Sequence, residues 1–360
     1  MSNFHEFFRV GRRSLPVLLL AFSVLQAEEK RPEQLRRIAF GSCATEHRPQ
    51  PIWDSVVRQK PDLFLFIGDN IYADTEDMDV MKAKYAQLGS QPGYQKLLRT
   101  CPVLATWDDH DYGVNDGGEW YPKKAESQQL MLDFFGVPKE SPRRQRPGVY
   151  GSYVFGPPSK RVQVILLDTR YFKSRPVKDS RSPEEKKQLN LVGWYIANTD
   201  PKGTILGENQ WKWLKAQLRE PAEVRILASS IQVVADEKGM ESWGNFPHER
   251  KRLYDLIGTT GAKGVLFISG DVHFSEISKT DQGPYPLYDF TSSSLTDPEK
   301  EWAAAVNHYR VSAVAFAQPT FGLIQIDWDQ PTPAITLQAY GLQGKVAFEK
   351  HICLDELPAK

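Results

Sequence analysis

Short, unbroken runs of apolar residues recur along the chain, and most end in polar residues. Runs of this length are typical of strands buried on both faces. Between several of them the apolar residues follow a helical period instead, which predicts amphipathic helices. We expect strands at 37–43, 63–69, 102–109, 162–170, 224–230, 264–271, 287–294 and 322–328, and helices at 51–60, 81–88, 208–218 and 248–258.

The alternation of strands and helices predicts an α/β domain. After about Gly283 the strands continue with little helix, so the sheet there is expected to be antiparallel or mixed. No linker or internal repeat divides the chain, and we expect a single domain over 28–360. Two polar segments, 136–153 and 173–189, are predicted to be surface loops near the strand ends. They are either ordinary solvated loops or a basic rim that attracts an anionic substrate.

The first residues have the order of an export signal. Paired arginines at 12–13 precede an apolar run over 15–25, and Ala27 stands before two glutamates. The run is shorter than the roughly 20 residues of a membrane-spanning helix. We therefore expect 1–27 to be a signal peptide, and the mature protein to be periplasmic or extracellular without a transmembrane anchor. The paired arginines suggest the twin-arginine route; a buried first helix is the alternative interpretation.

The composition excludes several classes of protein. The 360 residues are 41% hydrophobic, enough for a large core, and the negative mean hydropathy excludes a polytopic membrane protein. Lys plus Arg and Asp plus Glu both number 45, so no net field favours nucleic acid, and no stable nucleic-acid partner is expected. Three cysteines leave at least one unpaired. The sequence leaves open a disulfide between Cys101 and Cys353, and the oligomeric state.

The carboxyl ends of four predicted strands carry side chains that bind metals. In a parallel α/β sheet these ends meet at one edge, where ligands bind. Each residue alone has an ordinary explanation, such as a buried thiol or a turn cap. The stretch "WDDHD", however, packs three carboxylates and an imidazole together, and the carboxylates repel one another unless cations or solvent relieve them. The four ends supply Ser42 and Cys43; Asp69, Asn70 and Tyr72; Asp108, Asp109, His110, Asp111 and Asn115; and Asp271 and His273.

The mixed donor set favours two or more unlike metal ions. Thiolate and phenolate favour a transition metal, whereas carboxylates and amides suit harder ions. Two ions can clamp the attacking and leaving oxygens of a phosphoryl displacement, with a bridging hydroxide as the nucleophile. Two other classes remain. Cys43 could be a thiol nucleophile, although the nearby carboxylates disfavour a thiolate; a non-catalytic calcium-binding protein would not need Cys43 or Tyr72.

These residues resemble the motifs of the alkaline phosphatase D, or PhoD-like, family of the calcineurin-like metallophosphatase superfamily. The resemblance rests on "GSC", "GDNIYAD", "TWDDHDYGVND", "LLDTRYF", "LGENQWKWL" and "SGDVHFSE", in the family's order from about Arg37 to Ser278. It implies a four-layer α/β sandwich, with two packed mixed β-sheets flanked by helices. It also implies an enzyme that hydrolyses phosphomonoesters, phosphodiesters or both. Longer members carry an N-terminal β-sandwich domain, which the resemblance does not cover here, so a short form is expected.

The resemblance also implies which residues hold metal. Asp69 would bridge two ions. The first ion would be Fe³⁺, and the second Ca²⁺ or another divalent ion such as Mn²⁺, Mg²⁺ or Zn²⁺. The iron ligands would be Cys43, Tyr72 and His273, and the divalent ion would be held by Asp109 and Asp271, together with Asn115 and Asp108.

Two further residues are predicted to act on the phosphoester substrate. His110 stands where the superfamily places the histidine that polarises the phosphate or protonates its leaving group. Arg170, just past another predicted strand, either holds a phosphate oxygen or forms an ion pair with Asp168. The superfamily's histidine on a later strand is missing, and 229–232 offers serine and glutamine side chains instead. The ligands of the second ion are therefore the least defined part of the site.

Overall fold

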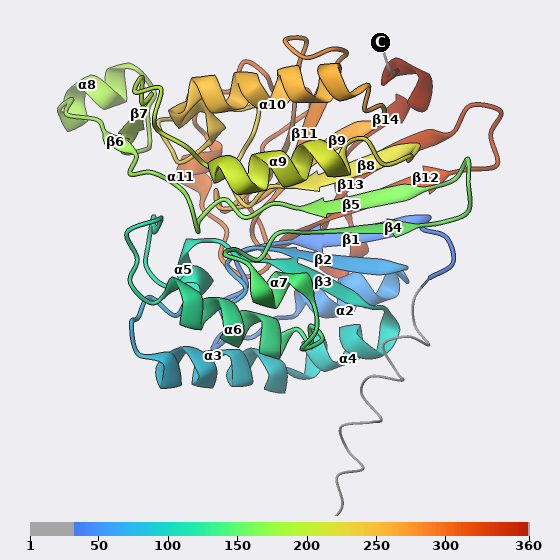
Figure 1. Cartoon of the computed structure of the whole chain (residues 1–360), viewed down its shortest axis with the longest axis horizontal. Helices are drawn as coiled ribbons and strands as arrows, with labels where there is room; N and C mark the ends of the chain where they lie inside the picture. The colour runs from blue at the N-terminus through green and yellow to red at the C-terminus, as the bar shows by residue number, and fades with distance from the viewer. Residues whose placement is uncertain (1–31, 359–360) are drawn as a thin grey trace, which may run out of the picture. The chain divides into compact units, whose positions relative to one another are not determined.

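The computed structural model describes residues 32–358, and two six-stranded sheets form its centre. The export signal predicted over 1–27 lies outside the described residues. Within the described part of the chain, no helix has the length and apolar character needed to cross a membrane. The two sheets pack face to face, and helices cover the outer face of each (Figure 1).

The first sheet contains the strands from both ends of the described chain. Its members are β1 (Arg37–Gly41), β2 (Leu63–Ile67), β3 (Val103–Thr106), β12 (Thr320–Asp327), β13 (Ala334–Gly341) and β14 (Val346–Cys353). The order is β14-β13-β12-β1-β2-β3. The strands β1, β2 and β3 are parallel, while β12, β13 and β14 are antiparallel to their neighbours. The sheet is mixed, as expected for its C-terminal part.

The second sheet is built from the middle of the chain. Its members are β4 (Gly151–Phe155), β5 (Val162–Leu166), β8 (Val224–Ala228), β9 (Val265–Ser269), β10 (Ser275–Thr280) and β11 (Leu287–Ser292). The order is β10-β11-β9-β8-β5-β4, with four parallel central strands and an antiparallel strand at each edge. The central strands therefore all end at the same edge.

The strand β2 is an unbroken apolar run because helices cover one of its faces and the second sheet covers the other. Phe64 and Phe66 pack in a core with the helices outside the first sheet, while Leu63 and Leu65 belong to the core shared with the second sheet. Every position of the strand is thus buried. The helices on the first sheet are α2 (Ile52–Arg58), α3 (Met78–Ser90), α4 (Pro92–Thr100) and α6 (Lys124–Phe134), and those on the second are α9 (Gly207–Gln217) and α10 (Pro247–Thr260). The predicted four-layer α/β sandwich is confirmed.

The two polar segments predicted to be loops contain regular structure. The first, 136–153, includes the short helix α7 (Pro142–Gln145) and the start of β4. Buried Arg143 holds it in place, because its guanidinium donates to the carbonyls of Val149 (2.6 Å) and Ala105 (2.9 Å). The second, 173–189, contains β6 (Val177–Lys178) and α8 (Pro183–Gln188). A capping box between Ser182 and Glu185 starts α8.

Cys101 lies buried and Cys353 is exposed, and the two do not form the disulfide that the sequence left open. The remaining elements are α5 (Asp109–Tyr112), β7 (Tyr195–Ile196), α11 (Lys300–Ala303) and the 3-10 helices η1 (Trp243–Asn245), η2 (Leu342–Gly344) and η3 (Leu354–Glu356).

Candidate metal centre

The ends of β1, β2, β3 and β9 meet, and they bring the predicted ligands together. One ligand atom from each of Cys43, Asp69 and His273 lies within 4.8 Å of the others. A second group within the same distance contains Asp69, Asp108, Asp109 and Asp271. Asp69 belongs to both groups.

The first group has the softer donors. The Cys43 Sγ atom lies 3.4 Å from Asp69 Oδ2, and the Tyr72 hydroxyl lies 3.5 Å from His273 Nε2. His273 Nδ1 is 2.5 Å from the carbonyl oxygen of Asp297. Since a carbonyl only accepts hydrogen bonds, Nδ1 is a donor, and Nε2 is the ring nitrogen that faces Tyr72.

Burial dominates the electrostatics of the acidic groups in this cluster, and the charge of nearby His110 offsets it only in part at Asp69. Burial, reinforced by the charge of Asp69 nearby, raises the pKa of Tyr72 well above its usual value. Burial also raises the pKa of Cys43 to about 12 and that of Asp69 well above its usual range. Bound cations favour the ionised forms and reverse these shifts.

The second group has only carboxylates, and two of their oxygens are orphaned. Asp69 Oδ1 and Asp108 Oδ2 are buried without a hydrogen-bond partner, which is costly unless another group satisfies them. Burial and the charges of Asp108 and Asp109 raise the pKa of Asp271. Hard divalent ions bind through carboxylate oxygens. The residues present therefore fit a soft-ligand metal on one side of Asp69 and a hard divalent ion on the other.

Four of the predicted ligands have left-handed backbone conformations. The φ angles are 58° at Cys43, 49° at Asp69, 70° at Asp271 and 58° at His273. Residues other than glycine adopt this region at a cost of about 1–3 kcal/mol, and such residues cluster at functional sites. The backbone reverses sharply directly after β1, β2 and β9, and each reversal places a side chain at the common edge of the sheets.

Asp111 positions two of the ligand-bearing loops. Its carboxylate accepts from the backbone N–H of Asp108 (2.8 Å) and of Asp69 (3.2 Å), and from Asn70 Nδ2 (2.5 Å). Burial raises its pKa to about 8, against the lowering effect of these hydrogen bonds. Asp111 therefore joins the end of β2 to the end of β3, and it is not itself in either group of candidate ligands.

His110 lies beside the metal groups at the cavity wall. Its Nδ1 is 2.8 Å from Asp74 Oδ2, and its ring packs on Tyr72 with a centroid distance of 4.4 Å. Burial alone would lower the pKa of His110, but the charges of Asp109, Asp69 and Asp74 outweigh burial and raise it to about 11. The side chain is 18% exposed, so a ligand in the cavity can reach it.

Arg170 does not form the ion pair with Asp168 that was one of the two predictions for it. The guanidinium is fully buried, pairs with Asp108 and lies 2.5 Å from Glu241 Oε2. The carboxylate of Asp168 accepts instead from the backbone N–H of Arg170 and of Tyr171, at 2.9 Å each. The ion pair with Asp168 is therefore not formed. Arg170 is also absent from the cavity lining, because its ion pairs with Asp108 and Glu241 keep the guanidinium buried.

Two acidic residues near the site were not predicted. Ligand atoms of Asp109, Asp116 and Glu241 lie within 4.8 Å of one another. Asp116 accepts at 2.8 Å from the amide of Asn115, which is exposed at the cavity. Asp116 could have been predicted from the sequence, because it directly follows the predicted ligand Asn115. Glu241 could not, because it lies in the loop before η1 and its position depends on ion pairs with Arg170 and Lys173.

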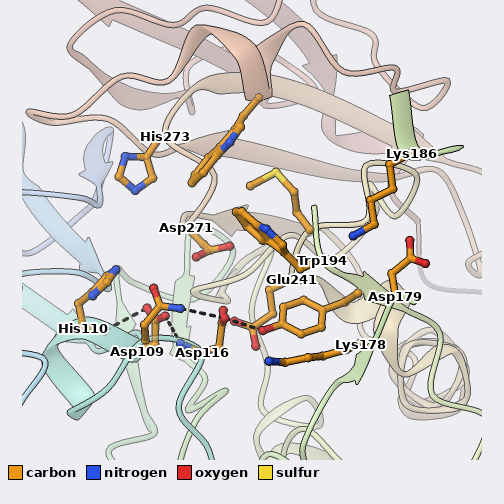
Figure 2. Close-up of a pocket in the computed structure, with 14 residues that line it drawn as sticks. Asp109, His110, Asp116, Lys178, Asp179, Lys186, Trp194, Glu241, Asp271 and His273 are labelled. Carbon is orange, nitrogen blue, oxygen red and sulfur yellow. Dashed lines mark hydrogen bonds between the residues drawn. The ribbon is translucent and has the colours of Figure 1, made fainter. Parts of the chain in front are cut away.

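These groups open into a cavity of about 440 Å³. Figure 2 shows His110, Asp109, Asp271 and His273 on one side of it and Lys178 and Lys186 on the other. The fold and the donor set define the class of protein: an α/β sandwich with a candidate site for two metal ions that share Asp69.

Comparisons with known proteins agree with this class. The PhoD-like phosphatase family matches residues 38–327, so the chain belongs to this family. Alkaline phosphatase D from Bacillus subtilis (strain 168) is 23% identical over 276 residues, which cover 66% of this chain and 46% of that protein. The chain thus spans about half the length of this curated relative. The resemblance indicated by the motifs is confirmed.

A solved structure shows the same fold. The structure of PhoD superposes with a TM-score of 0.65 at 17% identity, over 89% of this chain and 72% of that one. A dimetal phosphatase from Danio rerio gives a TM-score of 0.49 at 12% identity, over 89% of this chain and 99% of that one. The first of these matches supports the two-sheet architecture independently of sequence motifs.

Proposed function

We propose that the protein is a metal-dependent phosphoric ester hydrolase that acts on phosphomonoesters, phosphodiesters or both. The observation that carries the proposal is the sharing of Asp69 between a Cys43–His273 group and a carboxylate group beside an open cavity. Family membership supports a phosphatase reaction. Two metal ions, when bound, supply Lewis-acid activation of the phosphate and of the attacking water.

We propose a mixed centre with Fe³⁺ and Ca²⁺ or another divalent ion. Cys43, Tyr72 and His273 are the soft and anionic donors, suited to the iron. The carboxylates Asp108, Asp109 and Asp271 suit the harder ion, and Asn115 and Asp116 line the rim on that side. In this assignment Arg170 stabilises the carboxylate of Asp108 and does not bind the phosphate.

His110 is proposed to donate a proton or a hydrogen bond to the substrate. Its Nδ1 is occupied by Asp74, which leaves Nε2–H for a phosphate oxygen or for the leaving group. The neighbouring carboxylates keep the imidazole protonated, because they raise its pKa. A general acid contributes about 10²- to 10⁴-fold in rate when its proton lies within reach of the leaving oxygen.

The geometry gives less support to the two alternative functions. A cysteine nucleophile requires a thiolate, but burial raises the pKa of Cys43 to about 12 and its neighbours are acids. A calcium-binding protein has no use for the Cys43, Tyr72 and His273 grouping. Export to the periplasm or outside the cell is a further proposal, and it rests on the pattern of residues 1–27.

The first test combines metal analysis with assays of hydrolysis. Purified protein should contain iron and a divalent metal, show a visible charge-transfer band, and hydrolyse 4-nitrophenyl phosphate or bis(4-nitrophenyl) phosphate. A colourless protein with calcium alone and no turnover would favour the binding function. Activity in a metal-free sample, sensitive to thiol alkylation, would favour the cysteine nucleophile.

Asp69→Asn tests the shared ligand directly. Loss of a group that only orients a ligand costs about 10- to 100-fold, so we expect loss of a bridging carboxylate to lower kcat/KM by about 10³-fold or more. The amide is similar in size, so thermal unfolding should remain cooperative. The exposed Asp54 carboxylate on α2 offers a matched control in Asp54→Asn. Near-normal turnover of Asp69→Asn would disprove the assignment.

A further inference from the structure

One wall of the cavity comes from a segment that the metal centre does not use. Between β5 and α9 the chain forms the small antiparallel pair β6 and β7, with α8 between them. Figure 1 shows this segment projecting beyond the two sheets, on the side where α5 and α11 lie. It contributes Lys178, Asp179, Lys186, Trp194 and Tyr195 to the cavity. We call it the β6–β7 segment.

Backbone hydrogen bonds fix this segment relative to the centre. The N–H groups of Val192 and Gly193 both donate to the carbonyl of Lys238 at 3.0 Å, and that of Tyr195 donates to the carbonyl of Gly239 at 2.8 Å. The Tyr195 hydroxyl also donates to Asp116 Oδ2 at 2.5 Å. The wall is therefore positioned by the same loops that carry the acidic residues of the site.

The segment gives the far side of the cavity a positive charge. The Lys178 ammonium makes no ion pair or hydrogen bond within the described part of the chain, and Lys186 Nζ donates only to the carbonyl of Gly193, at 3.3 Å. The nearby carboxylate of Asp179 is bound by Arg181 at 2.8 Å. Lys186 faces the cavity from the side opposite Asp109 and Asp271, while the ammonium end of Lys178 points toward the side where Asp116 and Glu241 lie (Figure 2). Two ammonium groups are thus free to bind an anion.

An aromatic surface lies between the metal groups and the lysines. Trp194 is 49% exposed within the cavity. Its ring meets the edge of Trp302 with a centroid distance of 5.8 Å, and Trp302 packs in turn against His273 at 5.3 Å. In Figure 2, Trp194 stands between Asp271 and Lys186. An indole held in this way offers a flat apolar face to a ring in the cavity.

We propose that Trp194, Lys178 and Lys186 bind the leaving group and select one that combines a flat ring with a second negative charge. An example is a nucleotide phosphodiester with a neighbouring phosphate. The inference rests on the proposed function, because it places the reacting phosphate at the metal groups. The ring then stacks on Trp194, and the second anion reaches the lysines. Stacking of a base on an aromatic side chain contributes measurably and tolerates different bases.

The kinetic test compares two substrates that differ by one phosphate. The metal-loaded enzyme is assayed with the dinucleotide TpT and with its 5′-phosphorylated form, pTpT. For the wild-type enzyme we expect kcat/KM to be about tenfold higher for pTpT than for TpT, because KM is lower for pTpT. In the double variant Lys178→Gln/Lys186→Gln the ratio of the two kcat/KM values should fall to near one. The double variant with arginine at both positions should keep the preference. Lys187→Gln, an exposed neighbour on α8 outside the cavity, is the matched control.

A binding test separates this inference from the proposed function. Thymidine 3′,5′-bisphosphate is titrated calorimetrically into the metal-loaded wild-type protein, Trp194→Ala and the glutamine double variant. About tenfold weaker binding by each variant supports the subsite, even if the protein hydrolyses no ester and the proposed function is wrong. Equal binding by all three proteins would overturn the subsite. A preference for pTpT that persists in the glutamine double variant would also overturn it, even if the enzyme hydrolyses esters normally.

Discussion

Tyr72 contacts both histidines of the site. Its hydroxyl lies near His273 Nε2, and its ring packs on the imidazole of His110. The two contacts involve different parts of the side chain, so a substitution can remove one and keep the other. Substitutions at Tyr72 can therefore test separately whether its hydroxyl is a metal ligand and whether its ring positions His110.

Tyr72→Phe is expected to weaken or shift the visible absorption band of the iron-loaded protein, because the Tyr72 phenolate and the Cys43 thiolate are the two proposed ligands that can give charge transfer to the iron. The ring remains, so His110 should stay in place and part of the activity should survive. Absorption spectra at equal iron content provide the measurement. Tyr94→Phe, a buried tyrosine in the core of the helices on the first sheet, is the control. An unchanged band in Tyr72→Phe would exclude Tyr72 as a ligand.

The sequence predicted the residues at strand ends but missed two acidic residues that reach the site from loops, Asp116 and Glu241. Cys43, Asp69 and His273 follow apolar runs, and parallel strands bring such positions to a common edge. Glu241 stands in a segment with no such pattern. Its position depends on ion pairs with Arg170 and Lys173. Long-range pairs of this kind have no local signal, and for the same reason the partner of Arg170 could not be predicted.

At the scale of the elements, the β6–β7 segment depends on a close approach of two backbones. A Cβ atom added to Gly193 would lie 1.9 Å from the carbonyl oxygen of Gly239. No side-chain movement can relieve this contact, since both partners are main chain. Any substitution at Gly193 must therefore push the segment away from the loop that holds it.

Gly193→Ala is expected to lower kcat/KM for pTpT by about tenfold or more, because displacement of a positioned group by about 1 Å costs up to roughly 10²-fold. The metal content should not change, since none of the proposed ligands belongs to the segment. Kinetics and elemental analysis on one preparation test both statements. Gly258→Ala in α10 is the control, because its Cβ would make only an ordinary contact with Pro284. Loss of metal in Gly193→Ala would contradict the prediction.

The elements that the sequence predicted well are those buried on both sides. Continuous apolar runs gave β1, β2, β5, β8 and β9, and helical periods gave α2, α3, α9 and α10. The edge strands β4, β10 and β14 were missed, and so was β13 inside the first sheet, where buried and half-buried residues alternate over the first half of the strand. Edge strands carry polar residues on their exposed side; β14, for example, is mostly exposed or half-buried. Their pairing is decided by the neighbouring strand, which no local pattern specifies.

The molecule as a whole concentrates buried acids at one point, so its stability should depend on pH and metal. Burial raises the pKa of Asp111 to about 8 and those of Asp69 and Asp271 well above their usual range. In the unfolded chain these groups ionise near pH 4. Between these values the folded state binds more protons than the unfolded state, so the free energy of unfolding falls as pH rises.

We expect the melting temperature of metal-free protein to fall by several degrees from pH 5 to pH 8, since one kcal/mol corresponds to about 2–4 °C in domains of roughly 150–250 residues. Asp109 and Glu276, whose pKa values are lowered, titrate below this window. Burial lowers the pKa of Lys173 to about 7, which opposes the trend above that pH, but the raised pKa of His110 reinforces the trend over the same range. Calorimetry of metal-free and metal-loaded protein tests it. Bound metal should flatten the dependence, and a melting temperature that rises over this range without metal would contradict the prediction.

The position of β1 in the first sheet has a consequence for biosynthesis. One neighbour, β2, follows soon after it, but the other is β12, and the indole of Trp328 just past β12 donates to the carbonyl of Leu35, 293 positions earlier. A chain emerging from the ribosome therefore keeps one edge of β1 unpaired until β12 has been synthesised. Until then the open edge of β1 is a place where the nascent chain can pair with another chain, and a chaperone bound there would prevent aggregation.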